Sequence, residues 1–377
     1  MVIQIDKESL FKSINIADSI ISSKNINTIL ANCLFNVSKN SIEIISTDNE
    51  IAVRTKVEAK SDKAISFAVN GKKFSSILKE LPHDELSINV NESLSIDITS
   101  RSKEVKGHYT LIGLAADEFP EIPHFVEDNS IEIEQAVFKE MIRKVIYAAS
   151  SDTIKPVFNG IFFISDAKGN VSSVSTDSRR LALITRTVKQ DISFGDGIII
   201  PLKTVHEVYR LLESSGNCKF SYNNNQCFFK IANTEIISRI VDGQFPNYRQ
   251  VLPKEYMLEI EIETKKLFDS VKRAMIFTRE PANKIILNIQ SNKIIMQAST
   301  PELGEAEEEI AVKSNKDEKI SIGINAQFLI DALKEVDSEQ IKCGITGQMS
   351  PVTIIPINDI NYTSIIMPIQ IKSSQNE

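Results

Sequence analysis

The residue types that most often carry chemistry are scattered through this sequence. Its four cysteines form no Cys-x-x-Cys pair, and none of its four histidines stands at metal-ligand spacing from a cysteine or another histidine. This pattern favours free, mostly buried thiols over a metal site or a disulfide, so we expect neither a metal nor a cofactor. The cysteines are Cys33, Cys218, Cys227 and Cys343.

Three short motifs resemble parts of known sites but lack what those sites need. Val69-Asn-Gly-Lys-Lys-Phe-Ser-Ser76 has the Gly-Lys of a phosphate-binding loop, without its first glycine or the Ser/Thr directly after the lysine. Glu305-Ala-Glu-Glu-Glu309 is expected on an exposed loop or strand edge, with a bound metal as the weaker alternative. Gly195-Asp-Gly197 predicts a turn before a strand. The sequence thus offers no catalytic motif, and we expect that the protein is not an enzyme.

The distribution of charge is more informative than its sum. The net charge is −7, which taken alone argues against binding nucleic acid. The windows expected to be helical carry +8 together, which leaves −15 for the rest of the chain. One interpretation is that these helices share a surface that faces a polyanion; the other is that they simply have solvated faces. The windows are 7–24, 70–80, 137–147, 201–213, 264–279 and 325–336.

An amphipathic helix recurs at intervals of about 130 residues, which indicates an internal repeat. The copies cover residues 10–17, 137–145 and 267–274, and each opens with an apolar pair. In the second copy Phe138, Met141 and Val145 fall on one stripe that should pack. Its other face should meet solvent or a partner. That face carries Lys139, Glu140, Arg143 and Lys144.

Strands and a second helix follow each of these helices. The runs 29–37 and 42–47, 157–164 and 171–176, and 285–289 and 294–300 are expected to be strands, and the second run of each copy ends in Ser-Thr. A second helix is expected near 69–78, 200–208 and 324–333, with Asn70, Pro201 and Asn325 at its start. Alternating residues 131–134 and 258–263 should open copies two and three as half-exposed strands.

Three copies of one domain therefore account for the 377 residues, which are too many for a single hydrophobic core. The expected domains are 1–125, 126–252 and 253–377, in an α+β fold with two helices packed on antiparallel sheets in each domain. The start of the chain lacks the apolar core of a signal peptide and no apolar run approaches a membrane span, so a cytoplasmic location is expected.

Three motifs then resemble a known family. Thr176-Asp-Ser-Arg-Arg-Leu-Ala182, Val241-Asp-Gly-Gln-Phe-Pro-Asn-Tyr-Arg-Gln-Val-Leu-Pro253 and Ile365-Ile-Met-Pro-Ile369 resemble the bacterial DNA polymerase III beta subunit, the sliding clamp. The resemblance covers nearly the whole chain. It implies the DNA-clamp fold, a head-to-tail homodimeric ring that encircles double-stranded DNA, and a processivity role. It also implies a pocket between domains two and three for short peptides of the replicative polymerase, the clamp loader and repair polymerases.

The resemblance also assigns residues to these roles. The pocket would comprise Phe158, Thr176, Ser178, Arg179, Arg180, Leu181, Pro246, Tyr248, Gln250, Val251, Ile365, Met367, Pro368 and Ile369. Lys24, Lys72, Lys155 and Lys203 would face DNA, and the helix pattern adds Lys272 and Arg273. At the dimer interface, Tyr109 and Leu111 would face Ile276 and Phe277 of the other copy, although Ile276 and Phe277 could instead be core residues.

Several pocket residues depart from the family pattern, which puts the preferred partner in doubt. The family commonly has Gly-His at Ser178-Arg179, Arg at Gln250, and Met-Pro-Met-Arg-Leu where this chain has Met367-Pro-Ile-Gln370-Ile. Residues 372–377 extend past the usual end and are expected to form a disordered tail. Two other interpretations stay open: a clamp-like paralogue or scaffold that has lost partner contacts, and a nucleic-acid enzyme on a repeated β-rich fold.

Overall fold

The computed structural model describes residues 2–21, 29–81, 85–101, 106–127, 130–188 and 194–371. The chain divides into two compact units, and each is described by itself. Unit 1 contains residues 1–136 and 206–240, and unit 2 contains residues 137–205 and 241–377. The boundary therefore passes through the middle copy of the repeat. The predicted tail at 372–377 lies outside the described residues.

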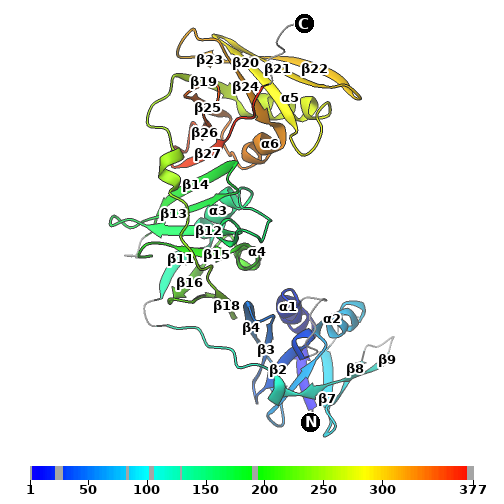
Figure 1. Ribbon diagram of the computed structural model, residues 1–377. Coiled ribbons are helices and arrows are strands. Elements are labelled where there is room, and N and C mark those ends of the chain that lie inside the picture. Colours follow the sequence, from blue (N-terminus) through cyan, green and yellow to red (C-terminus); the bar gives the residue numbers. More distant parts are fainter. Residues whose placement is uncertain are drawn as a thin grey trace. The chain divides into compact units, whose positions relative to one another are not determined.

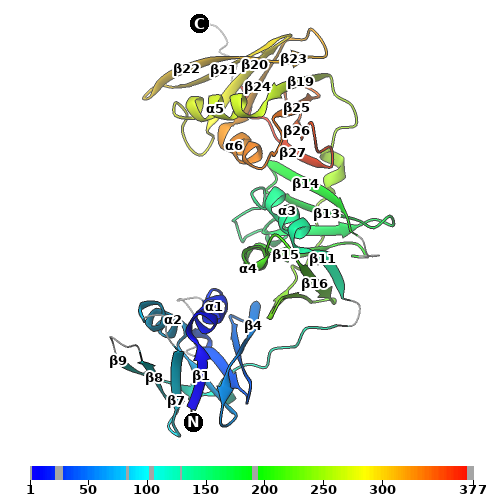
Figure 2. The same ribbon diagram turned by 180° about the vertical axis from the view of Figure 1, so that it is seen from behind.

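Unit 1 is built on two antiparallel sheets (Figures 1 and 2). The first has five strands in the order β5-β1-β7-β8-β9: β1 (Val2–Asp6), β5 (Lys60–Ser61), β7 (Glu85–Val90), β8 (Ser95–Arg101) and β9 (Lys106–Ile112). The second has nine strands in the order β10-β6-β2-β3-β4-β18-β17-β16-β11: β2 (Cys33–Val37), β3 (Ser41–Thr47), β4 (Ile51–Glu58), β6 (Ile65–Val69), β10 (Leu114–Ala115), β11 (Ile131–Glu134), β16 (Asn217–Tyr222), β17 (Gln226–Ile231) and β18 (Thr234–Arg239).

Unit 2 is built in the same way. Its larger sheet also has nine strands, in the order β15-β12-β13-β14-β27-β26-β25-β19-β23: β12 (Gly160–Ser165), β13 (Asn170–Thr176), β14 (Arg180–Thr187), β15 (Ile198–Pro201), β19 (Leu258–Glu263), β23 (Lys313–Ser314), β25 (Gln340–Ile345), β26 (Val352–Pro356) and β27 (Tyr362–Ile366). Its smaller sheet has four strands, β22-β21-β20-β24: β20 (Lys284–Gln290), β21 (Lys293–Thr300), β22 (Gly304–Ala311) and β24 (Ile320–Asn325).

Helices pack on the sheets through one apolar face each. Leu10 and Ile14 of α1 share a buried core with Phe74 and Leu78 of α2. An equivalent core of unit 2 contains α5 and α6. Figures 1 and 2 both show α1 beside α2 and α5 beside α6. The helices are α1 (Lys7–Asp18), α2 (Gly71–Glu80), α3 (Gln135–Ile146), α4 (Leu202–Leu211), α5 (Thr264–Met275) and α6 (Ala326–Lys334).

The recurring Ser-Thr pair ties each first helix to its sheet. Ser46 Oγ donates to the carbonyl of Ala17 at the end of α1, and Ser175 Oγ donates to the carbonyl of Val145 in α3. In the third copy the hydroxyl instead reaches the segment just after α5, where Thr300 Oγ1 donates to Phe277 O at 2.8 Å. The carbonyls in the last turn of a helix have no i+4 donor within it, so they can accept the two serine hydroxyls.

Most of the predicted elements are confirmed. Strands β11 and β19 have the predicted bounds, and all six helices lie where the pattern placed them. Asn70 and Asn325 cap α2 and α6 by accepting hydrogen bonds from Lys73 N and Phe328 N. Three details were wrong or incomplete. Short 3₁₀ turns replace the starts of the runs predicted at 29–37 and 157–164, and Pro201 ends β15 one residue before α4. No helix in the described part of the chain is long and apolar enough to cross a membrane.

Candidate functional site

Two strands far apart in sequence meet in unit 2, where β14 pairs with β27; we call this ladder the second junction. Leu181 lies opposite Ile365 in it, and both side chains are buried. They belong to one apolar cluster with Phe162, Phe245 and Tyr248. The rings of Phe162 and Phe245 stack with centroids 4.7 Å apart, and Tyr248 meets Phe162 edge-on. Aromatic packing therefore fixes the shape of this part of the surface.

A tight turn before β14 forms one edge of this cluster. Thr176 Oγ1 accepts a hydrogen bond from Ser178 N at 3.1 Å. Asp177 Oδ1 accepts one from Arg179 N at 2.9 Å. Ser178 has a φ of 74°, in the left-handed region that glycine adopts without strain. Met367 N donates to Arg179 O at 2.8 Å, so the turn is held against the chain that follows β27.

A hollow of about 500 Å³ lies beside the cluster and shares Pro246 and Tyr248 with the predicted pocket. The sequence prediction missed two of its aromatic residues, Phe162 and Phe245. Alternation along β12 could have placed Phe162 and Ile164 on one face, but it does not say which face meets a pocket. The hollow is lined by Phe162, Ile164, Asp196, Gln244, Phe245, Pro246, Asn247, Tyr248 and Arg249.

The predicted pocket residues differ in exposure. Leu181, Tyr248 and Ile365 share one cluster, and Arg179 contacts Met367, so these five lie together. The backbone of Ile369 instead pairs with Gly323. The buried and half-buried members are Phe158, Thr176, Arg180, Leu181, Tyr248, Ile365, Pro368 and Ile369, and the exposed ones are Ser178, Arg179, Pro246, Gln250, Val251 and Met367.

The Arg180 side chain is committed to other parts of unit 2. It forms ion pairs with Asp177 at 3.0 Å and with Asp331 of α6 at 2.6 Å. Its guanidinium also lies over the Phe328 ring, 4.5 Å from the centroid. Arg180 therefore joins β14 to α6, and its neighbour Arg179 is the arginine that faces solvent at the pocket.

One prediction about α3 was wrong. Lys144 was expected on the face that meets solvent or a partner, but it is 2% exposed and bonds to residues of its own unit. Its ammonium bonds to Asp337 Oδ2 at 2.7 Å and to Glu335 O at 2.6 Å, over the ring of Tyr362. Burial alone would raise the pKa of Asp337, but hydrogen bonds from Lys144 and Arg143 outweigh it and lower that pKa. The apolar stem and the paired charge together explain why this lysine is buried.

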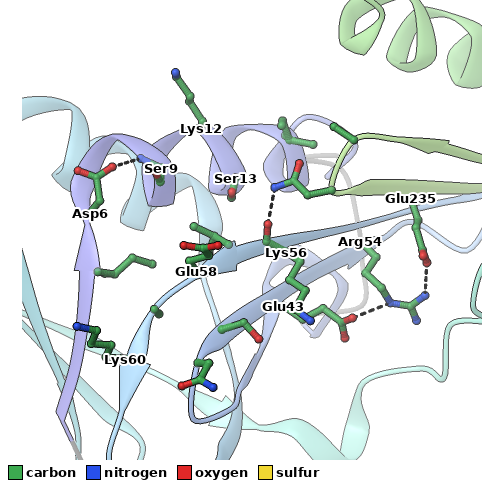
Figure 3. A pocket seen from close by; sticks show the side chains of 18 of the residues that line it. Asp6, Ser9, Lys12, Ser13, Glu43, Arg54, Lys56, Glu58, Lys60 and Glu235 are labelled. Atoms are coloured by element: carbon green, nitrogen blue, oxygen red, sulfur yellow. Dashed lines mark hydrogen bonds and ion pairs between the residues drawn. The ribbon is translucent and has the colours of Figure 1, made fainter. Parts of the chain in front are cut away.

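A second ladder of the same kind, the first junction, joins β4 to β18 in unit 1. Arg54 stands at its centre with a side chain that is 6% exposed. It pairs with Glu235 at 3.0 Å and with Glu43 at 3.5 Å (Figure 3). It also donates to the carbonyls of Ile122 and Pro123. One guanidinium thus clamps the chain segment around residue 122 onto the sheet.

The equivalent position at the second junction is Leu183, which cannot form such a clamp. Arg54 lies opposite Ile45, and Leu183 lies opposite Val174 in the matching ladder. The segment that contains Pro246 and Tyr248 is therefore held by apolar contacts, with a hollow beside it.

The two junctions also differ beside their first helices. A groove of about 1330 Å³ lies between α1, β4 and the turn that joins β17 to β18 (Figure 3). Val57 lines it. The second junction has Arg186 at the matching place, opposite Val171 as Val57 is opposite Ile42. Arg186 pairs with Glu140 of α3 and with Asp359. These bonds raise the pKa of Arg186, and the triad links α3 to the turn before β27.

The predicted DNA-facing residues lie on helices or on a helix-to-strand loop. Arg273 makes two 2.6 Å hydrogen bonds to Glu308, which offset its charge. That these residues share one surface facing DNA stays a prediction. Lys24 lies outside the described residues; Lys72 on α2, Lys155 before β12, Lys203 on α4, and Lys272 and Arg273 on α5 are exposed.

The predicted interface residues lie at two sheet edges or next to them. Tyr109 is 38% exposed on β9, whereas Leu111 is partly buried against the unit 1 core. Ile276 is 70% exposed just after α5, and Phe277 packs partly on the unit 2 core. Within the described strands, β9 pairs only with β8, and β22 pairs only with β21. Both strands therefore offer unpaired backbone groups.

The thiols are unsuited to nucleophilic chemistry, as expected for free, buried cysteines. All four are unpaired and buried. Burial raises the pKa of Cys218, Cys227 and Cys343 to about 12. The thiolate is the reactive form of cysteine, so these side chains are almost fully protonated near neutral pH. In the part of the chain that the structure describes, no three His, Cys, Asp or Glu side chains are grouped so that they could hold a metal ion.

Comparison with known proteins gives one consistent result. Residues 1–123, 132–247 and 249–370 match the models of the N-terminal, central and C-terminal domains of the DNA polymerase III beta subunit. The beta sliding clamp of Halalkalibacterium halodurans is 28% identical over 97% of this chain and 98% of its own, and that of Staphylococcus epidermidis is 26% identical over 98% and 99%. The solved sliding clamp of Bacillus subtilis aligns with a TM-score of 0.92 at 25% identity, and the beta subunit of Thermotoga maritima with 0.90 at 26%; each covers 98% of this chain and 99% of the solved one.

Proposed function

The chain belongs to the family of the DNA polymerase III beta subunit, the sliding clamps, and from this premise we propose that two copies close head-to-tail around double-stranded DNA as a replication processivity factor. We also propose that the predicted pocket at the second junction holds short peptides of the replicative polymerase, the clamp loader and repair polymerases, between domains 126–252 and 253–377. Catalysis has no part in this role.

The observation that carries the ring is a mismatch between the sheets. Two sheets are continuous across a junction and have nine strands each, whereas the other two have five and four strands. Pairing β9 of one copy with β22 of another would give nine strands again.

The internal repeat also predicts the register of this pairing. At the first junction Val53, which is opposite Ser46, pairs with Ile236. At the second junction Ala182, which is opposite Ser175, pairs with Ser364. In the third copy the residue opposite the serine of the Ser-Thr pair is Glu305.

On strand β9, Tyr109 occupies the position in the repeat that corresponds to Ile236 at the first junction and to Ser364 at the second. The match follows from the strand pairings. Each trace starts at the residue four positions before the first helix of a copy and steps from one paired residue to the next across the sheet. The traces from Ile3, Ile131 and Ile260 end at Tyr109, Ile236 and Ser364, respectively. We therefore expect Tyr109 of one copy to lie opposite Glu305 of the other, in an antiparallel pair.

A double variant tests both the ring and its register. Tyr109→Cys with Glu305→Cys should give a covalent dimer under mild oxidation, since directly opposed residues meet disulfide geometry. The native thiols are buried and do not compete. Tyr109→Cys with Glu309→Cys is the matched control, because its cysteines would be about 13 Å out of register. No covalent dimer, or equal yields from the two variants, would refute the proposed pairing.

Encirclement of DNA can be tested with the same variant. Oxidation in the presence of a nicked circular plasmid should trap closed rings on the DNA, and these rings should stay bound in high salt. Cutting the plasmid once should release them, because a closed ring slides off a free end whereas salt disrupts only phosphate contacts. Equal retention on circular and linear DNA would contradict encirclement. We place this activity in the cytoplasm, in keeping with four unpaired cysteines.

A further inference from the structure

The arginines of unit 2 fall into two groups. Five of the seven form ion pairs: Arg143, Arg180, Arg186, Arg273 and Arg279. Arg179 and Arg249 form none with any described residue, and both are exposed. These two arginines flank the predicted pocket. Arg179 accepts the backbone hydrogen bond of Met367, and Arg249 follows Tyr248 directly.

The backbone of Arg179 and the side chain of Arg249 are held in place before any partner arrives. Asp177 Oδ1 fixes Arg179 N at 2.9 Å, in the turn that Thr176 also braces. The Arg249 guanidinium lies over the ring of Tyr248, 5.6 Å from its centroid. A side chain ordered in advance loses less entropy on binding, so an ion pair formed with Arg249 is stronger than one formed by a free arginine.

Three exposed cations lie in or next to the predicted pocket: Arg179, Arg249 and Lys155. Lys155 is exposed, and its ammonium lies 5.9 Å from the ring centroid of the pocket residue Phe158. Among nearby acids, Asp177 is already paired with Arg180. Asp196 lines the same hollow as Arg249, without an ion pair to it in the described part of the chain. At the first junction, the place of Arg179 is taken by an acid, Glu50.

We infer that the preferred partner of this pocket is an acidic extended peptide, in which a carboxylate next to an apolar anchor pairs with Arg179 and Arg249. This inference rests on the proposed peptide-binding function and narrows it. The apolar anchor would pack against Leu181 and Ile365. An arginine guanidinium can bind a carboxylate through two parallel hydrogen bonds. Arg179 precedes Arg180, the first residue of β14 in its ladder with β27, and so lies close to the anchor site at Leu181 and Ile365. An extended peptide rises about 3.4 Å per residue, so the carboxylate should lie within about three residues of the anchor.

The test uses a library of fluorescein-labelled nonapeptides and the full-length protein. Each peptide has a central pair of apolar residues, with Asp, Asn or Lys at each of the three positions on either side. Every peptide is made with a free and with an amidated C-terminus, which separates a side-chain carboxylate from a terminal one. Affinities are measured by fluorescence polarisation at low and high salt. We expect the best acidic peptide to bind about five-fold more tightly than its Asn counterpart, and this ratio to fall at high salt.

Four variants assign the preference to residues. Arg179→Gln and Arg249→Gln should each reduce the Asp-to-Asn ratio towards one, because each removes a guanidinium that pairs with the carboxylate and not with the amide. Arg179→Lys should restore part of it, because lysine keeps the charge but not the paired donors. Lys168→Gln, which removes a charge from the exposed turn between β12 and β13, is the control and should leave the ratio unchanged.

The outcomes separate this inference from the function on which it rests. Peptides that bind with no preference for Asp, or a preference that survives in both arginine variants, would overturn the acidic-peptide inference and leave the pocket in place. If no peptide in the library binds, both the inference and the pocket proposal fail.

Discussion

The first and second junctions are two solutions to the same structural problem. Each joins successive copies of the repeat through one antiparallel ladder, β4 with β18 or β14 with β27. The first depends on one buried guanidinium, Arg54, which binds two carboxylates and two carbonyls. The second is stabilised by several ion pairs, formed by Arg143, Lys144, Arg180 and Arg186.

This difference explains where a binding site can form. Arg54 holds the segment around Ile122 and Pro123 down on the sheet, whereas the matching segment of the second junction has a hollow beside Tyr248. At the second junction, ion pairs on α3 and α6 supply the cohesion and leave the far face of the ladder apolar and open. The ion pairs and the apolar cluster thus lie on opposite sides of one sheet.

Removal of Arg54 should have the largest effect on stability. Arg54→Ala leaves Glu43 and Glu235 without their cation and two carbonyls without a donor, so unfolding should require about 3 kcal/mol less. Urea unfolding measures this change. Arg210→Ala in the same unit removes an arginine whose side chain is 43% exposed, and should cost less than about 0.5 kcal/mol. Equal costs would contradict the clamp role of Arg54.

Replacing a single charged side chain at the second junction should lower the free energy of unfolding less than Arg54→Ala does, because several ion pairs stabilise this junction. Arg180→Ala loses the pairs with Asp177 and Asp331 and should lower the free energy of unfolding by about 2 kcal/mol. Arg179→Ala, one residue earlier, should change it by less than about 0.5 kcal/mol, since that side chain is exposed and unpaired among the described residues. If the order of the two variants were reversed, the assignment of roles would be wrong.

The turns that enter β4 and β14 offer a smaller, matched test. Asn49 and Ser178 both have a φ of 74°. Ser178→Gly should raise the free energy of unfolding by roughly 0.5–1 kcal/mol, because it relieves the left-handed strain. Asn49→Gly should gain less, since asparagine tolerates this conformation better than serine. Thermal unfolding of the two variants compares them, and an equal gain would argue against strain at Ser178.

The smallest expected effect depends on pH. The pKa of Asp337 is lowered in the folded protein, so its contribution is present above its ordinary value of 3.8 and is lost as the pH falls through the folded value. Asp337→Asn should therefore cost less than about 1 kcal/mol near neutral pH, because the side chain is 62% exposed, and nearly nothing at pH 3. Urea unfolding at several pH values tests this. A cost that stays constant from pH 3 to 7 would exclude the ion pair as its cause.

The sequence predicted the elements far better than it predicted the contacts between them. Helices such as 137–145 and strands such as 258–263 follow from local periodicity, which one segment can reveal. The pairing of Arg54 with Glu235 joins residues 181 positions apart and depends on a ladder register that no periodicity encodes. Lys144 shows the same limit, because its buried place follows from Asp337 on another element.

The predicted pocket residues overlap only in part with the apolar cluster and the hollow of the structure. Resemblance placed Leu181, Tyr248 and Ile365, which do share one cluster. It missed Phe162 and Phe245, whose stacking depends on how a loop folds back on β12. It also gave no sign that Arg179 and Arg180, adjacent in sequence, have opposite surroundings. That difference arises because Arg179 lies in the turn before β14, whereas Arg180 is the first residue of the strand and pairs with Asp331 of α6.

The central claim is that two copies close into a ring through β9 and β22, and size-exclusion chromatography coupled to small-angle X-ray scattering tests it most directly. The account predicts a particle of twice 42.2 kDa at micromolar concentration, with the scattering profile of a flat, hollow ring. A compact particle of 42.2 kDa with no central hole would contradict it.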